Sequence, residues 1–215
     1  MKRAPVFDEI YAKYLQDVST IDPARVSSRL GLQIEGEAVV VPFYDSPYRV
    51  SGSGVTDANG HRPSHAVSVI LCKYLLMCPD AEPESGTDWV TYGSFKDALP
   101  FAGGFRNTAE QPIAKAFSGR LKALADSGAV LGGKPFEAPF PADLTLWFPA
   151  LPTVPLLMVF NDQDDEFPAQ CSLFFERRAG AYLDMECLAM LGMVLASWLK
   201  GKPAPGEPEF LTDFE

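Results

Sequence analysis

The chain has 215 residues, 47% of them hydrophobic and 21% charged, with a formal net charge of −10. This composition excludes a disordered chain, and the acidic charge argues against nucleic-acid binding and attachment to anionic membranes, both of which need basic surfaces. No apolar run approaches the roughly 20 residues that cross a bilayer, so we expect a soluble, cytoplasmic protein.

The first third of the chain alternates helix and strand signals. Residues 5–18 carry apolar side chains at helical spacing, and an Asp-Pro pair followed by a glycine predicts a second helix over residues 22–31. Residues 32–43 read as a β-hairpin around Glu-Gly-Glu, and residues 48–50 as a further short strand. The Gly, Asp, Asn and Pro content of residues 51–63 predicts a loop.

The middle of the chain contains two predicted helices. Residues 64–77 form a helix with a serine N-cap, and residues 89–92 form a short strand. A Thr-x-x-Gln capping box predicts a helix that starts at Thr108 and ends near residue 127. Residues 135–155 are rich in proline and aromatic side chains, which predicts an irregular segment packed on the core.

The last third predicts a hairpin and a helix. Residues 154–160 and 170–176 read as two strands joined by an acidic turn, and residues 184–200 as a helix capped by aspartate. Strands and helices come in separate runs, which favours a single α+β domain over residues 1–201, with a mainly antiparallel sheet and a C-terminal helix. The acidic, proline-rich tail of residues 202–215 is expected to be partly ordered.

Apolar positions on the predicted elements identify a candidate core. We expect one hydrophobic cluster made of Leu71, Tyr74, Leu157, Val159, Phe174 and Leu188. The four cysteines form no C-x-x-C pair and are expected to be free thiols.

The acidic run from Asn161 to Pro168 is the sharpest chemical feature of the sequence. It places Asp162, Asp165 and Glu166 within one turn, and carboxylates of this kind bind hard cations such as calcium or magnesium. The spacing does not match a calcium-binding loop, however, and a solvated hairpin turn is the competing interpretation. In that turn we expect Phe167 to fold inward.

Other candidate residues lie elsewhere in the chain. His65 and His61 are four residues apart, and a pocket that joined the acidic turn to Asp143, Glu186 or His65 would indicate a metal-dependent enzyme. Arg106 follows two glycines, and with free helix amides it would form an anion site. The glycine pairs match no nucleotide-binding motif.

A resemblance to a known family is carried by several runs of residues. They are Leu-Pro-Thr-Val-Pro-Leu at 151–156, Asp-Glu-Phe-Pro-Ala at 165–169, Leu-Phe-Phe at 173–175 and Leu-Asp-Met-Glu-Cys-Leu at 183–188. They resemble an uncharacterised prokaryotic domain-of-unknown-function family. In some members a similar domain is joined to an iron–sulfur domain like those of corrinoid proteins of one-carbon metabolism, typically in anaerobes. This chain has no cysteine cluster of its own.

Two functions follow as hypotheses. The first is a binding or accessory module, which the resemblance links to a protein partner in a corrinoid or iron–sulfur system. The second is a metal-dependent enzyme that uses the acidic turn at 162–166. The sequence identifies no cofactor, and the resemblance transfers no catalytic residue.

Overall fold

A computed structural model describes residues 5–83, 88–137 and 141–201. Two antiparallel sheets and their helices form an α+β fold that ends in the long helix α7 (Met185–Leu199), which confirms the predicted fold class. The predicted tail at 202–215 lies outside the described residues. None of the described helices combines the length and the apolar character needed to cross a bilayer.

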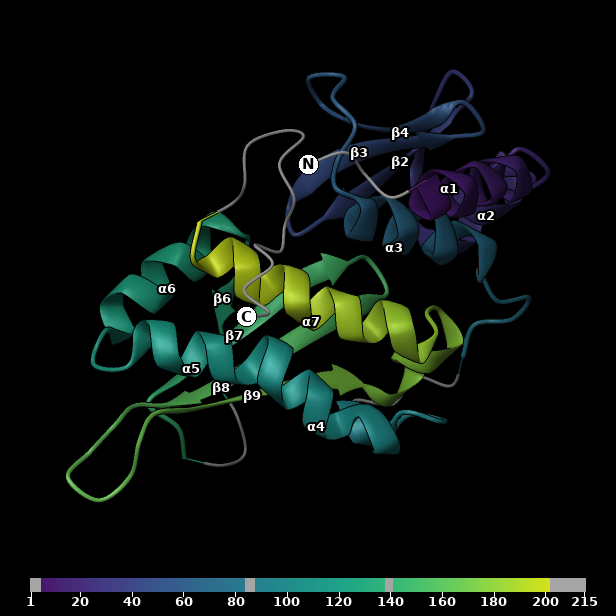
Figure 1. Cartoon of the computed structure of the whole chain (residues 1–215). Helices are drawn as coiled ribbons and strands as arrows, with labels where there is room; N and C mark the ends of the chain where they lie inside the picture. The colour runs from purple at the N-terminus through teal and green to yellow at the C-terminus, as the bar shows by residue number, and fades with distance from the viewer. Residues whose placement is uncertain (1–4, 84–87, 138–140, 202–215) are drawn as a thin grey trace.

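The smaller sheet has the strand order β1-β2-β3-β4 and lies with the first three helices in the N-terminal part of the chain (Figure 1). The strands are β1 (Gln33–Glu35), β2 (Ala38–Phe43), β3 (Ser46–Ser51) and β4 (Gly54–Asp57), and the helices are α1 (Pro5–Val18), α2 (Pro23–Leu30) and α3 (His65–Leu76). The prediction of a loop over residues 51–63 was therefore wrong at β4. The glycines there form a tight turn, and Val55 is buried opposite Val50 of β3.

The larger sheet has the order β5-β9-β8-β7-β6, with α5, α6 and α7 in front of it in Figure 1. Its strands are β5 (Trp89–Thr91), β6 (Lys134–Pro135), β7 (Leu144–Leu151), β8 (Val154–Asn161) and β9 (Gln170–Glu176). The helices are α4 (Ala102–Phe105), the π-helix η3 (Arg106–Glu110), α5 (Gln111–Phe117), α6 (Leu121–Val130) and α7, with short 3₁₀ turns at η1 (Tyr92–Ser94), η2 (Leu99–Phe101) and η4 (Arg177–Ala181).

Two predictions for the middle of the chain were wrong. The segment predicted to be irregular contains the regular strand β7, because Pro149 falls where the pairing with β8 shifts register and a missing N–H is tolerated. The single predicted helix over 108–127 begins earlier, at Ala102, and is interrupted between α5 and α6. Gly119 in that interruption has a φ of +68°, which cannot continue a helix.

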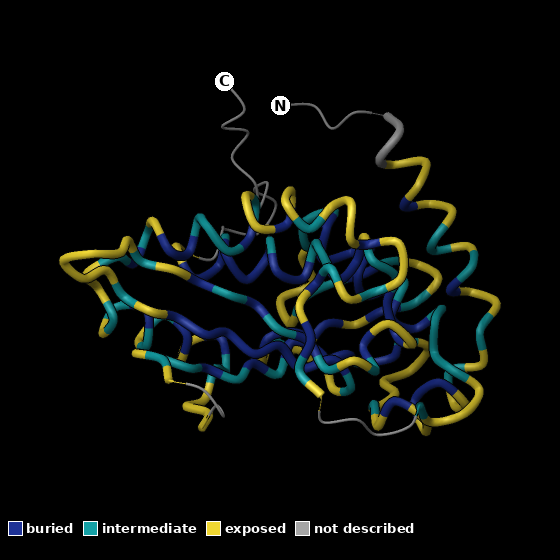
Figure 2. The backbone as a smooth tube through the Cα atoms, turned by 90° about the horizontal axis from the view of Figure 1, so that it is seen from below, coloured by how far each residue is buried: buried dark blue, intermediate teal, exposed yellow. Residues whose placement is uncertain are grey.

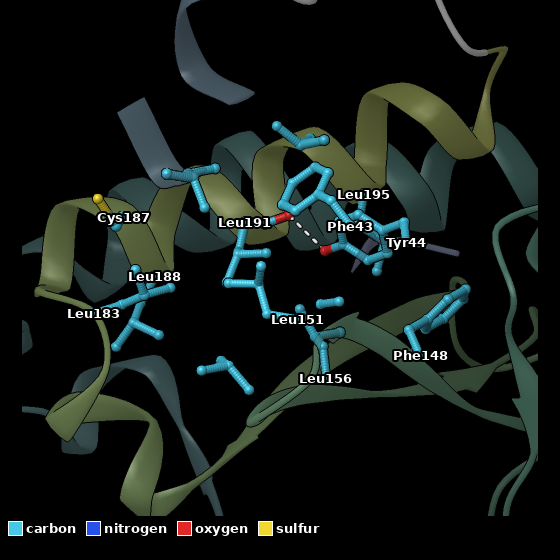
Figure 3. Close-up of a cluster of buried hydrophobic side chains, with 14 of the residues drawn as sticks. Phe43, Tyr44, Phe148, Leu151, Leu156, Leu183, Cys187, Leu188, Leu191 and Leu195 are labelled. Atoms are coloured by element: carbon cyan, nitrogen blue, oxygen red, sulfur yellow. Dashed lines mark hydrogen bonds between the residues drawn. The ribbon is translucent and has the colours of Figure 1, made fainter. Parts of the chain in front are cut away.

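The turn between β2 and β3 joins the two halves of the protein. Tyr44 and Asp45 both have positive φ angles, 44° and 62°, which matches a tight hairpin turn. The backbone N–H of Tyr44 donates to the carbonyl of Ala150 in β7 at 3.2 Å, and its hydroxyl donates to the carbonyl of Leu191 in α7 at 2.9 Å (Figure 3). The tip of the small sheet therefore lies inside the core of the larger one.

The predicted core was right in part. Leu71, Tyr74 and Leu188 belong to the main cluster of buried residues, which Figure 2 shows as dark blue segments running through the molecule. Leu157 and Val159 are buried as well but lie outside that cluster, and Phe174 is half-buried. Neighbouring residues of a strand face opposite sides of its sheet, so these side chains point away from the helix-covered face.

An ion pair connects α3 to α7. Asp184 is the N-cap of α7 and accepts the N–H of Cys187 at 2.9 Å, while Lys73 lies 2.8 Å from its other oxygen. Burial alone would raise the pKa of Asp184, but the Lys73 ammonium and the Cys187 N–H outweigh it and hold that pKa below its ordinary value. The carboxylate is thus the form that the folded protein favours.

We expect Asp184→Asn to lower the free energy of unfolding by about 1–2 kcal/mol at neutral pH, since it removes the charge but keeps an N-cap. Because its pKa is lower in the folded protein than in the unfolded one, the Asp184 carboxylate stabilises the fold above about pH 4. This stabilisation is lost as the pH falls further. The difference between variant and wild type should therefore shrink below about pH 4 in urea titrations. Asp126→Asn, in the exposed pair with Lys122, is the matched control, and an equal loss there would contradict the assignment.

Candidate functional site

A groove opens where the edge strand β5 ends. β5 pairs with β9 only from Glu176 to Phe174, and after Thr91 the chain turns away into η1. β9 extends four residues further along this edge, to Gln170, and the space beside it is a cavity of about 720 Å³. We call this cavity the β9 groove. It is bounded by β9, by the end of β5 with η1 and η2, and by the helical run from Ala102 to Lys115.

A π-helix forms one wall of the groove. In η3, the N–H of Gln111 donates to the carbonyl of Arg106, five residues earlier. The next residue, Pro112, has no N–H and its ring would clash with the carbonyl four residues before it in an α-helix, so the wider turn accommodates it. Thr108 also donates its hydroxyl to Gly104 at 2.9 Å. Single π turns inside helices are frequent at functional sites.

Alternate residues of β9 point their backbone N–H and C=O groups into the groove. Asp143 donates its N–H to the carbonyl of Phe160, so the backbone groups of Phe160 point towards β7. Phe160 is paired with Cys171, and in an antiparallel ladder the backbone groups of Cys171 then point to the opposite side, towards the groove. Leu173, two residues on, follows the same pattern.

Glu110 occupies part of this strand edge. Its Oε1 accepts the N–H of Leu173 at 2.9 Å. Burial raises the pKa of Glu110, while the Leu173 N–H and the guanidinium of Arg106 act in the opposite direction. Glu110 thus takes the place that a carbonyl of a longer β5 would have.

Cys171 lies at the floor of the groove. Its thiol is buried, and burial together with the nearby Glu110 carboxylate raises its pKa well above the ordinary value. The protonated thiol is not a nucleophile, so this residue contributes an apolar surface. Cys72, Cys78 and Cys187 are also free in the structure.

The groove carries two exposed cations, Arg106 and Lys115. Within the described residues neither side chain forms an ion pair or a hydrogen bond, whereas Arg25, Arg49 and Arg178 each pair with an acid. Arg106, predicted from the sequence as a candidate anion-binding residue, lies on the wall of this groove. The predicted free helix amides beside it are absent from the described chain, because α4 begins four residues earlier and the helical run is continuous.

The acidic turn is held by backbone hydrogen bonds. Asp162 Oδ1 accepts the N–H of Gly119 at 2.7 Å and that of Gln163 at 2.8 Å. Asp143 Oδ2 accepts the N–H of Asp162 at 2.7 Å, so the structure brings these two candidate residues together through a backbone hydrogen bond. Their bonds connect the β8–β9 turn to the interruption between α5 and α6, which is a structural role.

The rest of the turn is solvated. Asp164 Oδ1 accepts the N–H groups of Glu166 and Phe167, which lower the pKa of Asp164. Asp165 and Glu166 are exposed. The prediction that Phe167 folds inward was wrong, because its side chain is 59% exposed. The Asp164 bonds fix the backbone of the turn without any apolar anchor.

The structure does not bring the other candidate residues to this turn. His65 is the first residue of α3, and Glu186 lies in the first turn of α7, and neither lines the β9 groove. In the part of the chain that the structure describes, no three His, Cys, Asp or Glu side chains come together as a metal site would need. Glu110 was missed because a single half-buried acid leaves no signal in a sequence.

Comparison with known proteins gives one match. The family model of a domain of unknown function, DUF3786, covers residues 22–198. No curated protein and no solved structure matches the chain.

Proposed function

The chain belongs to the DUF3786 family, and on that premise we propose that it is a binding or accessory module whose docking site is the β9 groove. One observation carries the proposal. The groove combines an open strand edge, apolar walls and two exposed cations, Arg106 and Lys115, that form no ion pair or hydrogen bond within the described residues. These are features that hold a ligand.

The size and composition of the groove support this function. Ligand sites in proteins usually occupy about 300–1,000 Å³ and combine apolar walls with a few placed polar groups. The cavity here is about 720 Å³. Its apolar walls include Tyr92, Phe105 and Ala114, and its polar groups include Gln111 and Ser172.

A screen of small fragments by NMR tests this proposal. We expect fragments that bind the ¹⁵N-labelled protein to shift the amide signals of residues 91–94, 106–115 and 170–172. Ser94→Trp, which adds bulk at the groove, should abolish those shifts, while Ser53→Trp on the β3–β4 turn should leave them unchanged. Fragments that cluster elsewhere, or that bind Ser94→Trp equally well, would contradict the docking site.

The physiological setting forms a finer part of the proposal. We propose that the module acts in the cytoplasm of a prokaryote, beside an iron–sulfur or corrinoid protein of one-carbon metabolism, and the resemblance described above supports this partner. Within the described residues no three cysteines come together, and Cys72, Cys171 and Cys187 are buried, so the partner would supply the cluster. Size-exclusion chromatography under argon with a purified corrinoid iron–sulfur protein should then show a joint peak, and two separate peaks at 50 μM or so would argue against this partner.

The alternative, a metal-dependent enzyme that uses the turn at 162–166, makes a different prediction. A cation site there requires that calcium, magnesium or manganese raise the melting temperature and that Glu166→Gln remove the effect. Because the turn is held by backbone bonds to Asp164, we expect no such rise. We expect Asp164→Ala to lower the melting temperature and Glu166→Gln to leave it unchanged. An ion-dependent rise lost in Glu166→Gln would instead establish the metal site.

A further inference from the structure

We propose that the ligand of the β9 groove is an extended, acidic peptide segment of another protein, which adds to β9 as a strand in line with β5. This inference depends on the proposed function and specifies the class of partner. It would give the larger sheet a longer edge strand, supplied by the partner.

The first support is the free backbone of β9. A strand that continued beyond Thr91 would pair with Leu173, Ser172 and Cys171, but the chain leaves the sheet at that point. Among the backbone groups on this edge, the N–H of Leu173 already donates a hydrogen bond to Glu110. The N–H and the carbonyl of Cys171 point the same way, and among the described residues no hydrogen bond to them is present. One peptide residue opposite Cys171 can exchange both bonds with it.

The second support is charge. Arg106 and Lys115 stand on the helical wall of the groove, in a protein with a net charge of −10. Arginine pairs with carboxylates through two parallel hydrogen bonds, which gives direction as well as attraction. The third charged residue of the lining is the half-buried Glu110, so the groove keeps a net positive charge, which attracts an acidic side chain of the peptide and repels a basic one.

The third support is an exposed apolar residue in the lining. Leu99 of η2 lines the groove and is 73% exposed. Alternate side chains of an added strand point to opposite faces, so an apolar residue next to the acid can contact Leu99.

Selection from a phage-displayed library of random linear 12-residue peptides, with the full chain immobilised, tests the inference. We expect enriched peptides that combine an acidic residue with alternating apolar residues and that bind with micromolar dissociation constants in fluorescence anisotropy. Arg106→Glu should weaken that binding at least tenfold. Arg29→Glu makes the same charge change on an exposed arginine of α2, outside the groove, and should leave the binding unchanged.

Backbone pairing has its own readout. Methylation of the one peptide amide that faces Cys171 should abolish binding, while methylation of the next amide should have little effect, and the Cys171 amide should become protected from hydrogen exchange. An N-methyl scan without alternation, or protection only elsewhere, would overturn strand addition.

The remaining outcomes separate the two proposals. If no peptide is enriched while fragments still shift the groove amides, the partner class is wrong and the docking site stands. If neither binds, both fail. If the Cys171 amide becomes protected only as the protein concentration rises, and sedimentation shows a dimer, the occupant is a second copy of this chain and the inference is overturned.

Discussion

Replacement of Tyr44 by alanine is expected to lower the free energy of unfolding by about 3–5 kcal/mol, the range for truncating a buried aromatic side chain. Tyr44 is buried, and its ring meets those of Phe43, Phe148 and Trp198 edge-to-face. Its hydroxyl also donates to Leu191 (Figure 3). The substitution thus removes packing and a buried hydrogen bond at once.

Two further variants serve as controls, one for the hydroxyl of Tyr44 and one for the backbone of the turn. Tyr44→Phe keeps the ring and removes the hydroxyl, so we expect it to cost about 1 kcal/mol. Asp45→Gly relieves the positive φ of the next residue and should be neutral or slightly stabilising. Urea unfolding followed by tryptophan fluorescence measures all three. A loss below about 1 kcal/mol for Tyr44→Ala would show that the hairpin tip does not stabilise the core.

Leu157→Ala is expected to cost about 2–5 kcal/mol even though Leu157 lies on the face of β8 that points away from the helices. Its side chain has an exposed fraction of 0%, so its truncation leaves a cavity. On that face of the sheet, Trp89 and Phe136 meet edge-to-face with ring centroids 5.9 Å apart. On this face, cross-strand neighbours and these rings thus bury Leu157, as the helices bury side chains on the other face.

Leu99→Ala is the matched control, because it removes the same atoms from a leucine that is largely exposed. It should change the free energy of unfolding by less than about 0.5 kcal/mol. If Leu157→Ala costs no more than Leu99→Ala in the same denaturant titration, the outer face of the larger sheet is not packed in solution.

Elements with strong local signals were predicted well. Ser64 and Asp184 cap α3 and α7 through their own side chains, and the paired apolar runs of β8 and β9 form the expected hairpin. Local chemistry determines these features, so a sequence reveals them. The face of the sheet on which Leu157 lies depends instead on where the helices pack, which no local pattern encodes.

The candidate site shows the same division. Arg106 was named as a candidate because glycines precede it, but the β9 groove exists because β5 is shorter than β9, and the length of a pairing is a property of two distant segments. The acidic turn drew attention through its charge density. Its carboxylates Asp162 and Asp164 bind backbone N–H groups, and that use of a carboxylate depends on the path of the chain.

The insertion of the β2–β3 turn has a consequence for synthesis on the ribosome. Tyr44 and its acceptor Leu191 are 147 residues apart in the chain. At about 5–20 residues per second, roughly 7–30 s pass between the emergence of the two residues. During that time Phe43 and Tyr44 lack α7, and for the first two thirds or so they lack β7 as well, so the nascent small sheet presents an aromatic tip to chaperones and to other chains. The late helix α7 therefore completes the first sheet as well as the second.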